Sequence, residues 1–257
     1  MKLTDQTILI TGGTSGIGRA LAEALHQRGN QVIIAGRRQA LLDEITAAHP
    51  GMHGMRLDVE DAGAVDAFAK QVAEQFPGLN VLVNNAGISK AEDLTANIVD
   101  HSVARSIIQT NVVSVLHLTA ALLPTLRRQR AATIVTTSSG LAFLPRVGFP
   151  TYSASKAFLH SWLQSLRAQL AKTSVEVLEL VVPYVQTALT GSSQAVDPHA
   201  MPLADYVAEL MQMLSEPTPP SGEIVANRSK ALRWAERNGE YEQMFAARVA
   251  ALDPQFT

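Results

Sequence analysis

Short runs of β-branched and aliphatic residues alternate along the chain with longer segments in which apolar residues recur every three or four positions. The short runs are typical of strands buried on both faces, and the longer segments are typical of helices that cover a sheet. Their alternation predicts a parallel sheet wrapped by helices. We expect seven strands, over residues 7–11, 31–35, 53–58, 81–84, 132–138, 175–182 and 223–226.

Six helical segments are predicted around these strands, over residues 17–28, 37–48, 61–76, 95–130, 151–172 and 203–214. We expect residues 1–257 to form a single doubly wound domain, because one α/β domain commonly has this length and no linker divides the chain. Residues 188–202 are polar, contain Gly, Ser and Pro and lack a clear period, so we expect a mobile loop there. Residues 228–250 are expected to form a helical tail.

Composition excludes several classes of function. A formal net charge of −2 provides no basic field for nucleic acid. The chain has no cysteine, which excludes disulfides, thiolate nucleophiles and Cys-based zinc sites, and its seven histidines lie in separate helical segments or near turns, so we expect no metal. No apolar run approaches the roughly 18 residues of a membrane span, and residues 1–10 do not resemble a signal peptide. We therefore expect a cytoplasmic protein that does not act at a membrane.

A glycine-rich turn joins the first strand to the first helix, with the sequence Thr11-Gly12-Gly13-Thr14-Ser15-Gly16-Ile17-Gly18. Backbone N–H groups and the helix dipole can receive a pyrophosphate there, and glycines leave room for it. The spacing is Gly-x-x-x-Gly-x-Gly instead of the common Gly-x-Gly-x-x-Gly, so a simple tight connection is the alternative. Because a strand precedes the turn and a helix follows it, we predict dinucleotide binding by Gly12, Thr14, Ser15, Gly16, Ile17 and Gly18.

The end of the second strand bears on which dinucleotide binds. An acidic residue there would bind the adenosine ribose of NAD, but the chain reads Ala35-Gly36-Arg37-Arg38. Without a carboxylate, and with guanidinium groups available, the 2′-phosphate of NADP would be attracted. The alternative is that both arginines are solvated residues at the helix start, although the dipole disfavours cations there. We predict that NADP(H) is preferred over NAD(H) and contacts Arg37 and Arg38.

Tyr152 and Lys156 stand four residues apart in a predicted helix, so the phenol and the ammonium share one helix face. A phenol has a pKa near 10, and a neighbouring cation in a low-dielectric cleft would lower that pKa toward neutrality. A Tyr and a Lys four residues apart on a helix more often have no catalytic role, and are simply neighbours on the surface and in the core. The pair gains weight only from the other motifs.

Together these motifs resemble the short-chain dehydrogenase/reductase family over nearly the whole chain. The family's other motifs are matched in order by Asn84-Asn85-Ala86-Gly87, Asn111, Ser139 and Pro183 with Thr187. Within the family, the chain is similar to the subgroup of DltE-type short-chain oxidoreductases through residues 81–87, 136–143 and the helical tail. The resemblance implies an α/β fold with a single-domain Rossmann-type doubly wound parallel sheet of about seven strands.

The resemblance also implies roles for individual residues. Tyr152 would be the general acid in reduction and the base in oxidation, and Lys156 would lower its pKa and hold the nicotinamide ribose. Ser139 would hydrogen-bond the substrate oxygen, and Asn111 would position a water that links Lys156 to solvent. Further cofactor contacts would come from Asp58, Val59, Asn85, Ala86, Gly87, Pro183, Val185 and Thr187.

The expected function is NADPH-dependent reduction of a small-molecule ketone or aldehyde, reversible as alcohol oxidation. A hydrophobic substrate pocket is expected from Leu141, Phe143, Leu144, Phe149 and Tyr184. The alternative is an NADP-binding sensor without turnover, which has no reason to keep Ser139, Tyr152 and Lys156 together. Because the chain ends in a helical tail instead of the family's glycine-ended terminus, we expect a homodimer through the long helices around Asn111 and Tyr152, with the family's tetramer as the alternative.

Overall fold

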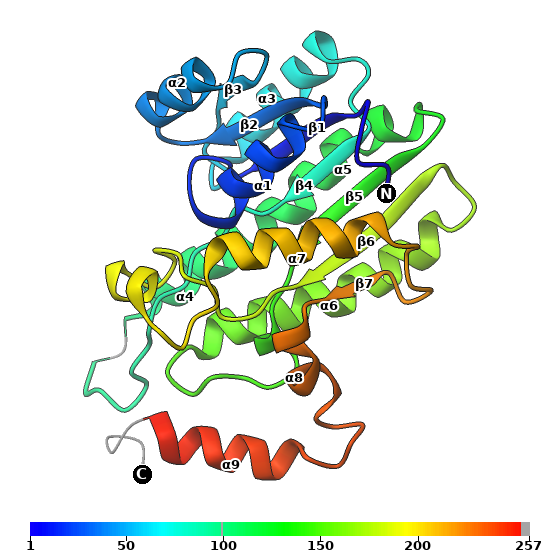
Figure 1. Cartoon of the computed structure of the whole chain (residues 1–257). Coiled ribbons are helices and arrows are strands. Elements are labelled where there is room, and N and C mark those ends of the chain that lie inside the picture. Colours follow the sequence, from blue (N-terminus) through cyan, green and yellow to red (C-terminus); the bar gives the residue numbers. More distant parts are fainter. Residues whose placement is uncertain (99, 253–257) are drawn as a thin grey trace.

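A sheet of seven parallel strands forms the centre of the structure, a computed structural model that describes residues 1–98 and 100–252. The strands lie in the order β3-β2-β1-β4-β5-β6-β7 (Figure 1). Chain order reverses between β1 and β4, which opens a crevice beyond the carboxyl ends of these two strands. The α/β doubly wound fold is thereby confirmed. The strands are β1 (Thr7–Thr11), β2 (Gln31–Gly36), β3 (His53–Arg56), β4 (Val81–Asn84), β5 (Ala132–Thr137), β6 (Val175–Val181) and β7 (Glu223–Val225).

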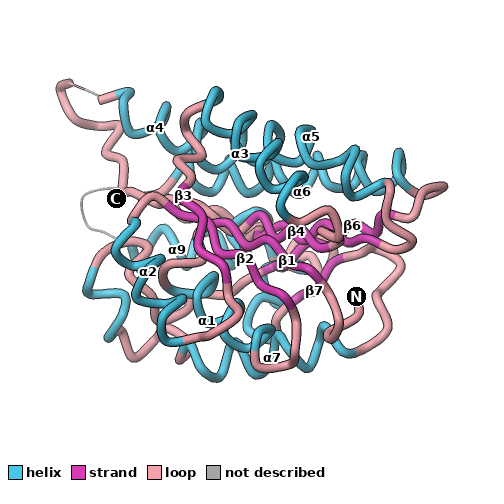
Figure 2. The backbone as a smooth tube through the Cα atoms, turned by 90° about the horizontal axis from the view of Figure 1, so that it is seen from above, coloured by secondary structure: helices cyan, strands magenta, loops and turns pink. Residues whose placement is uncertain are grey.

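Helices cover both faces of this sheet (Figure 2). One face carries α1 (Gly16–His26), α2 (Gln39–Ala48) and α7 (Leu203–Ser215). The other carries α3 (Ala62–Gln75), α4 (His101–Ile108), α5 (Ser114–Arg127) and α6 (Pro150–Leu170). Short turns and the tail complete the elements: η1 (Gln109–Val113), η2 (Gly140–Ala142), η3 (Ser192–Val196), η4 (Asn227–Ser229), α8 (Lys230–Trp234) and α9 (Tyr241–Leu252).

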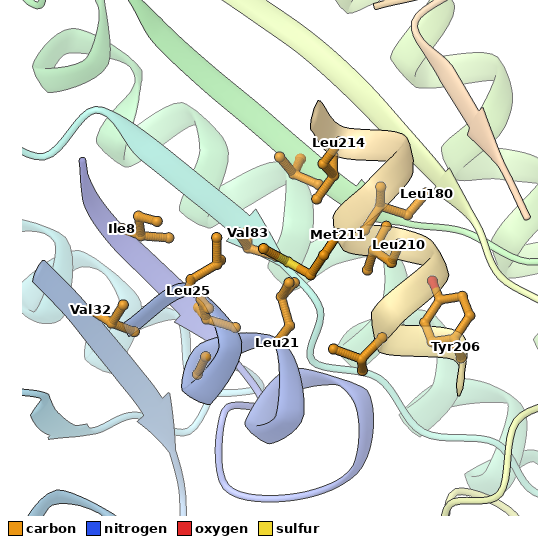
Figure 3. Close-up of a cluster of buried hydrophobic side chains, with 14 of the residues drawn as sticks. Ile8, Leu21, Leu25, Val32, Val83, Leu180, Tyr206, Leu210, Met211 and Leu214 are labelled. Carbon is orange, nitrogen blue, oxygen red and sulfur yellow. The ribbon is translucent and has the colours of Figure 1, made fainter. Parts of the chain in front are cut away.

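Two hydrophobic clusters join the helices to the sheet, one on each face. Successive strand residues point to opposite faces, so Ile8 and Ile10 of β1 enter the first cluster while Leu9 enters the second. Figure 3 shows the first cluster, in which Leu21 of α1 and Met211 of α7 lie against the strands. Burial on both faces explains why the strands are continuously apolar, as the sequence pattern indicated.

The long helical segment expected over residues 95–130 needs correction. The helix begins at His101, because the Asp100 carboxylate accepts a hydrogen bond from the Ser102 N–H at 2.8 Å and caps it. Residue 99 lies outside the described residues. The run is also interrupted by a π-helical turn, η1, and ends at Arg127. Apolar spacing did not reveal the interruption, because a single wide turn shifts the register by only about one residue.

This run, His101–Arg127, is the one helix among the described residues that is long and apolar enough to cross a membrane. Its two halves pack inside the fold instead, α4 against α6 and α5 against α3. The side chains of Leu118, Leu122 and Leu126 are buried in the second hydrophobic cluster. The run is therefore a core helix whose apolar side chains meet other elements of the same chain.

The segments expected as a loop and a tail also have defined positions. Residues 188–202 contain η3, and a parallel bridge between Met201 and Val185 ties them to the segment that follows β6. In Figure 1, α9 lies apart from the sheet, below α6 and α8. The mobility of residues 188–202 and the assignment of residues 1–257 to one domain stay predictions.

Candidate active site

The glycine turn after β1 packs directly against the turn that follows β4. Gly12 has a positive φ of 67°, and a Cβ atom there would lie 2.9 Å from the Cα of Ala86. A Cβ atom on Gly18 would lie 2.4 Å from the Asn85 side-chain nitrogen. These glycines are therefore required for the close approach of two turns, in addition to any room they leave for phosphate.

Thr11, the last residue of β1, holds the two turns together. Its buried hydroxyl oxygen accepts hydrogen bonds from the backbone N–H groups of Asn85 at 3.0 Å and Ala86 at 3.1 Å. The Asn85 side chain in turn donates to the Thr11 carbonyl at 3.1 Å. The Asn-Asn-Ala-Gly sequence thus lies beside the glycine turn at the crevice of the sheet.

The first turn of α1 is open to an anion. Ser15 precedes the helix in an extended conformation, and its side chain makes no capping hydrogen bond. The N–H groups at the start of α1 therefore keep their hydrogen-bonding capacity, and the helix dipole adds a partial positive charge. These residues fit the pyrophosphate of a dinucleotide.

Arg38 and Arg37 are placed differently. Arg38 lies over the glycine turn, where its guanidinium donates to the hydroxyl oxygens of Thr14 and Ser15, each at 3.0 Å. The Arg37 side chain is 61% exposed and lies 3.9 Å from a carboxylate oxygen of Glu60. Of the two arginines predicted to contact the cofactor, the structure thus brings Arg38 to the glycine turn and leaves Arg37 in solvent.

Asp58 and Val59 follow β3 beside the end of β2. The preceding residue, Leu57, donates its N–H to the Gly36 carbonyl at 3.0 Å, which sets this segment next to Arg37 and Arg38. Asp58 is exposed and accepts a hydrogen bond from the Glu60 N–H. The expected contact of both residues with the adenosine of the cofactor stays a prediction.

Tyr152 and Lys156 lie on the same buried side of α6, which begins at Pro150. The Lys156 ammonium is 5.7 Å from the centre of the Tyr152 ring and donates to the Thr137 carbonyl at 2.8 Å. Ser139, at the end of β5, is also buried and accepts a hydrogen bond from the Leu141 N–H. Three of the four residues predicted to be catalytic, Ser139, Tyr152 and Lys156, thus meet at the carboxyl edge of the sheet.

The pKa of Tyr152 is shifted in the opposite direction from the sequence-based expectation. Burial raises the pKa of its phenol to about 12, and a hydrogen bond with Ser139 lowers it only in part. The reason is that an ionised phenolate would lose its hydration, while the Lys156 ammonium is engaged by the Thr137 carbonyl. At neutral pH the phenol therefore carries its proton.

Lys156 shares its surroundings with a carboxylate that sequence reasoning missed. Burial lowers the pKa of the Lys156 ammonium to about 8, and Glu179 acts in the opposite sense. Glu179 is fully buried on β6, and its carboxylate lies 2.8 Å from Nδ1 of His160. The available signal was a glutamate inside a strand expected to be buried on both faces.

Asn111 lies in the π-helical turn η1 and is fully buried. Its side chain accepts from the Ile88 N–H and donates to the Ile88 carbonyl, both at 2.9 Å, and it also donates to the Ser155 hydroxyl at 3.1 Å. The amide therefore fixes the segment after β4 against α6. Its expected role in holding a water for Lys156 stays a prediction.

A cavity of about 360 Å³ opens over Ser139 and Tyr152. Its lining includes several residues expected near substrate or cofactor, namely Ile17, Leu141, Phe149, Pro183, Tyr184, Val185 and Thr187. The lining also includes Leu189, Thr190, Gln194 and Asp197, which belong to the expected loop at residues 188–202. Sequence reasoning missed another group, which comes from segments far apart in the chain: Ser89, Arg146, Leu232 and Arg248. Spacing in the sequence carries no signal for such a set, because only folding brings these segments together.

Two residues expected in the pocket do not line it. Leu144 is fully buried in the protein. The Phe143 ring packs edge-on against His160 at 4.6 Å and under the Arg233 guanidinium at 4.4 Å. Both follow the short helical turn η2, which directs their side chains into the protein instead of the cavity.

A Lys156→Met substitution should make the protein more stable at pH 7 by roughly 1 to 3 kcal/mol, because it removes a buried charge. The folded-state pKa of about 8 lies below the ordinary 10.5, so the ammonium destabilises the fold fully below pH 8. This cost disappears as the pH rises from 8 to 10.5. Urea unfolding across that range should show the difference between the variant and the parent shrinking.

The matched control is Lys172→Met, which changes an exposed lysine on the loop after α6 and should alter stability by less than about 0.5 kcal/mol. If Lys156→Met is less stable than the parent at every pH, the bond to Thr137 outweighs burial and the interpretation is wrong.

Comparison with known proteins agrees with this geometry. A family model described as short chain dehydrogenase matches residues 6–197. An uncharacterized oxidoreductase of Bacillus subtilis (strain 168), DltE, is 40% identical over 248 residues, which cover 95% of this chain and 97% of that protein.

Solved structures show the same fold. A short-chain dehydrogenase from Streptomyces avermitilis superimposes with a TM-score of 0.81 at 26% identity, covering 94% of this chain and 96% of that one. A short chain dehydrogenase from Burkholderia cenocepacia in complex with NADP also gives a TM-score of 0.81, at 24% identity over 99% of this chain and 100% of that one. The chain belongs to the short-chain dehydrogenase family of oxidoreductases, which use NAD or NADP.

Proposed function

We propose that this oxidoreductase reduces a ketone or aldehyde with NADPH. The proposal is carried by one observation, that Ser139 and the protonated phenol of Tyr152 line a single cavity beside the crevice of the sheet. A general acid must hold its proton until the substrate oxygen gains charge. A neutral phenol meets that need in the direction of reduction, and in the reverse direction the same oxygen would accept the proton.

Each polar side chain has one task in this proposal. Tyr152 gives its proton to the carbonyl oxygen as that oxygen becomes an alcohol. Ser139 donates a hydrogen bond to the same oxygen and stabilises the developing charge. Lys156 supplies positive charge behind the phenol, held in place by the Thr137 carbonyl. NADPH, when bound, would supply the hydride for the carbonyl carbon.

The preference for NADPH is supported by Arg38. Its guanidinium spans Thr14 and Ser15 of the glycine turn, at the end of β2 where an NAD-binding protein would carry an acid. The solved Burkholderia cenocepacia protein of the same fold holds NADP. Arg38 is therefore the residue proposed to pair with the 2′-phosphate, and Arg37 has the lesser role.

The Tyr152→Phe variant should lose at least about a thousandfold in the turnover number, because Phe keeps the ring but has no proton to give. NADPH binding, measured by fluorescence titration, should stay within about threefold of the parent. Turnover is followed as NADPH oxidation against a panel of ketones, diketones and aldehydes. Retained activity in the variant contradicts the mechanism, and tight NADPH binding without turnover of any carbonyl by the parent favours a nucleotide sensor.

For the cofactor, Arg38→Ala should weaken NADPH binding roughly 10- to 100-fold, as expected for loss of a charge-assisted hydrogen bond to phosphate. NADH binding should change by less than about threefold. Arg37→Ala is the matched control and should have the smaller effect on NADPH. Equal losses for NADPH and NADH would show that Arg38 only supports the glycine turn.

The proposed assembly is a cytoplasmic homodimer through the outer faces of α4 and α6, which pack side by side. Three large apolar side chains of this region are exposed: Ile108 of α4 at 47%, Val113 of η1 at 41% and Phe158 of α6 at 45%. Such a patch favours a partner surface of the same kind.

In sedimentation velocity the parent should therefore run as a dimer of the 27.6 kDa chain, and Phe158→Glu should run as a monomer. Val196→Glu, on the exposed turn η3, is the control and should leave the dimer intact. A monomeric parent, or a dimeric Phe158→Glu variant, contradicts this interface.

A further inference from the structure

Two guanidinium groups line the cavity that contains Ser139 and Tyr152. Arg146 precedes α6, and Arg248 belongs to the tail helix α9. Both side chains are partly buried. Neither arginine takes part in any of the ion pairs found among the described residues. The folded chain thus brings two cations from separate segments into one cavity without pairing either with a carboxylate.

The two cations act on each other. Burial lowers the pKa of Arg248, and the neighbouring Arg146 lowers it further. Arg248 is oriented by one hydrogen bond, from its Nη1 to the Leu144 carbonyl at 3.0 Å, and Arg146 lies over the Phe149 ring at 4.7 Å. Like charges in a partly buried site repel, and an anion placed between them removes that repulsion.

The remaining lining restricts which anion fits. Asp197 is the one carboxylate among the residues that line the cavity, and it accepts a hydrogen bond from the Tyr184 hydroxyl at 3.1 Å. Two arginines and one aspartate leave a single excess positive charge, which matches a monoanion better than a dianion. The lining also includes apolar side chains, among them Leu141, Leu189 and Leu232.

We propose that the substrate is an oxo acid: its carbonyl group meets Ser139 and Tyr152, and its carboxylate binds between Arg146 and Arg248. This inference rests on the proposed carbonyl reduction and names the substrate class for the same cavity. The product is the corresponding hydroxy acid, with the hydride on the former carbonyl carbon and the Tyr152 proton on its oxygen. The apolar lining holds the carbon chain that joins the two ends of the substrate.

The helical tail is held in place by other contacts besides that of Arg248. A Cβ atom on Gly140 would lie 2.8 Å from the Leu232 side chain, so α8 packs tightly on η2. Arg233 of α8 also pairs with Glu223 of β7 through a hydrogen bond of 3.0 Å. A substitution at Arg248 should therefore remove its charge while α8 stays docked.

The test compares oxo acids of increasing chain length with their methyl esters, which keep the carbonyl and lose the charge. The parent should have a kcat/KM for at least one acid that is roughly 10- to 100-fold above that of its ester. Arg146→Gln and Arg248→Gln should each abolish most of this preference while the kcat/KM of the ester changes by less than about threefold. Arg237→Gln, an exposed arginine beside Trp234 in the tail, is the matched control and should change neither value.

A binding measurement separates this inference from the proposed function. Isothermal titration of the NADP-loaded enzyme with saturated carboxylic acids, which have no carbonyl, should show binding that Arg146→Gln and Arg248→Gln weaken. If esters are reduced as well as acids, the carboxylate site is wrong while carbonyl reduction stands. If no carbonyl is reduced but the acids bind through both arginines, the proposed reaction is wrong and the anion site stands. Equal binding of acids by all variants, or a stronger preference for phosphate-bearing ketones, overturns the inference.

Discussion

The contact between the glycine turn and the turn after β4 is the constraint on which the site depends. Thr11 joins the two turns through its hydroxyl and its carbonyl, and glycines at positions 12 and 18 permit an approach that any Cβ atom would block. Because β1 and β4 are neighbours in the sheet, this contact lies where chain order reverses. It fixes the first turn of α1 relative to β4, whose neighbour β5 leads to Ser139.

The reacting side chains are held at a cost in electrostatic free energy. Tyr152, Lys156 and Glu179 are all buried. Burial shifts the pKa values of Tyr152 and Lys156 in the directions that favour their neutral forms. Desolvation of this kind is typical of functional sites, where the fold tolerates groups that a hydrophobic core would exclude. The Thr137 carbonyl and Glu179 limit the cost for Lys156, which is why residues of β5 and β6 belong to the description of the site.

The tail adds a second cation, Arg248, to the cavity that contains Ser139 and Tyr152. Leu232 of α8 packs against Gly140, and Arg248 of α9 donates a hydrogen bond to the Leu144 carbonyl, so both join the cavity lining beside residues 141–149. Arg146 comes from the latter segment, about a hundred positions earlier in the chain. Their meeting puts two cations and the phenol of Tyr152 in one cavity, which the proposed substrate with a carboxylate and a carbonyl requires.

The sequence by itself determined the sheet, its helices and the motifs of the family, because buried strands, amphipathic helices and glycine turns are local patterns that survive in one dimension. All seven strands were predicted with ends within two residues of those observed. The π-helical turn around Asn111, the difference between Arg37 and Arg38, the carboxylate of Glu179 and the two cavity arginines were decided only by the tertiary structure. Each depends on the distance between segments far apart in the chain, and on burial, which sets the direction of a pKa shift.

The same limit explains why Phe143 and Leu144 were wrongly expected in the cavity. Adjacency to Ser139 in the sequence does not determine the direction in which a side chain points after a turn.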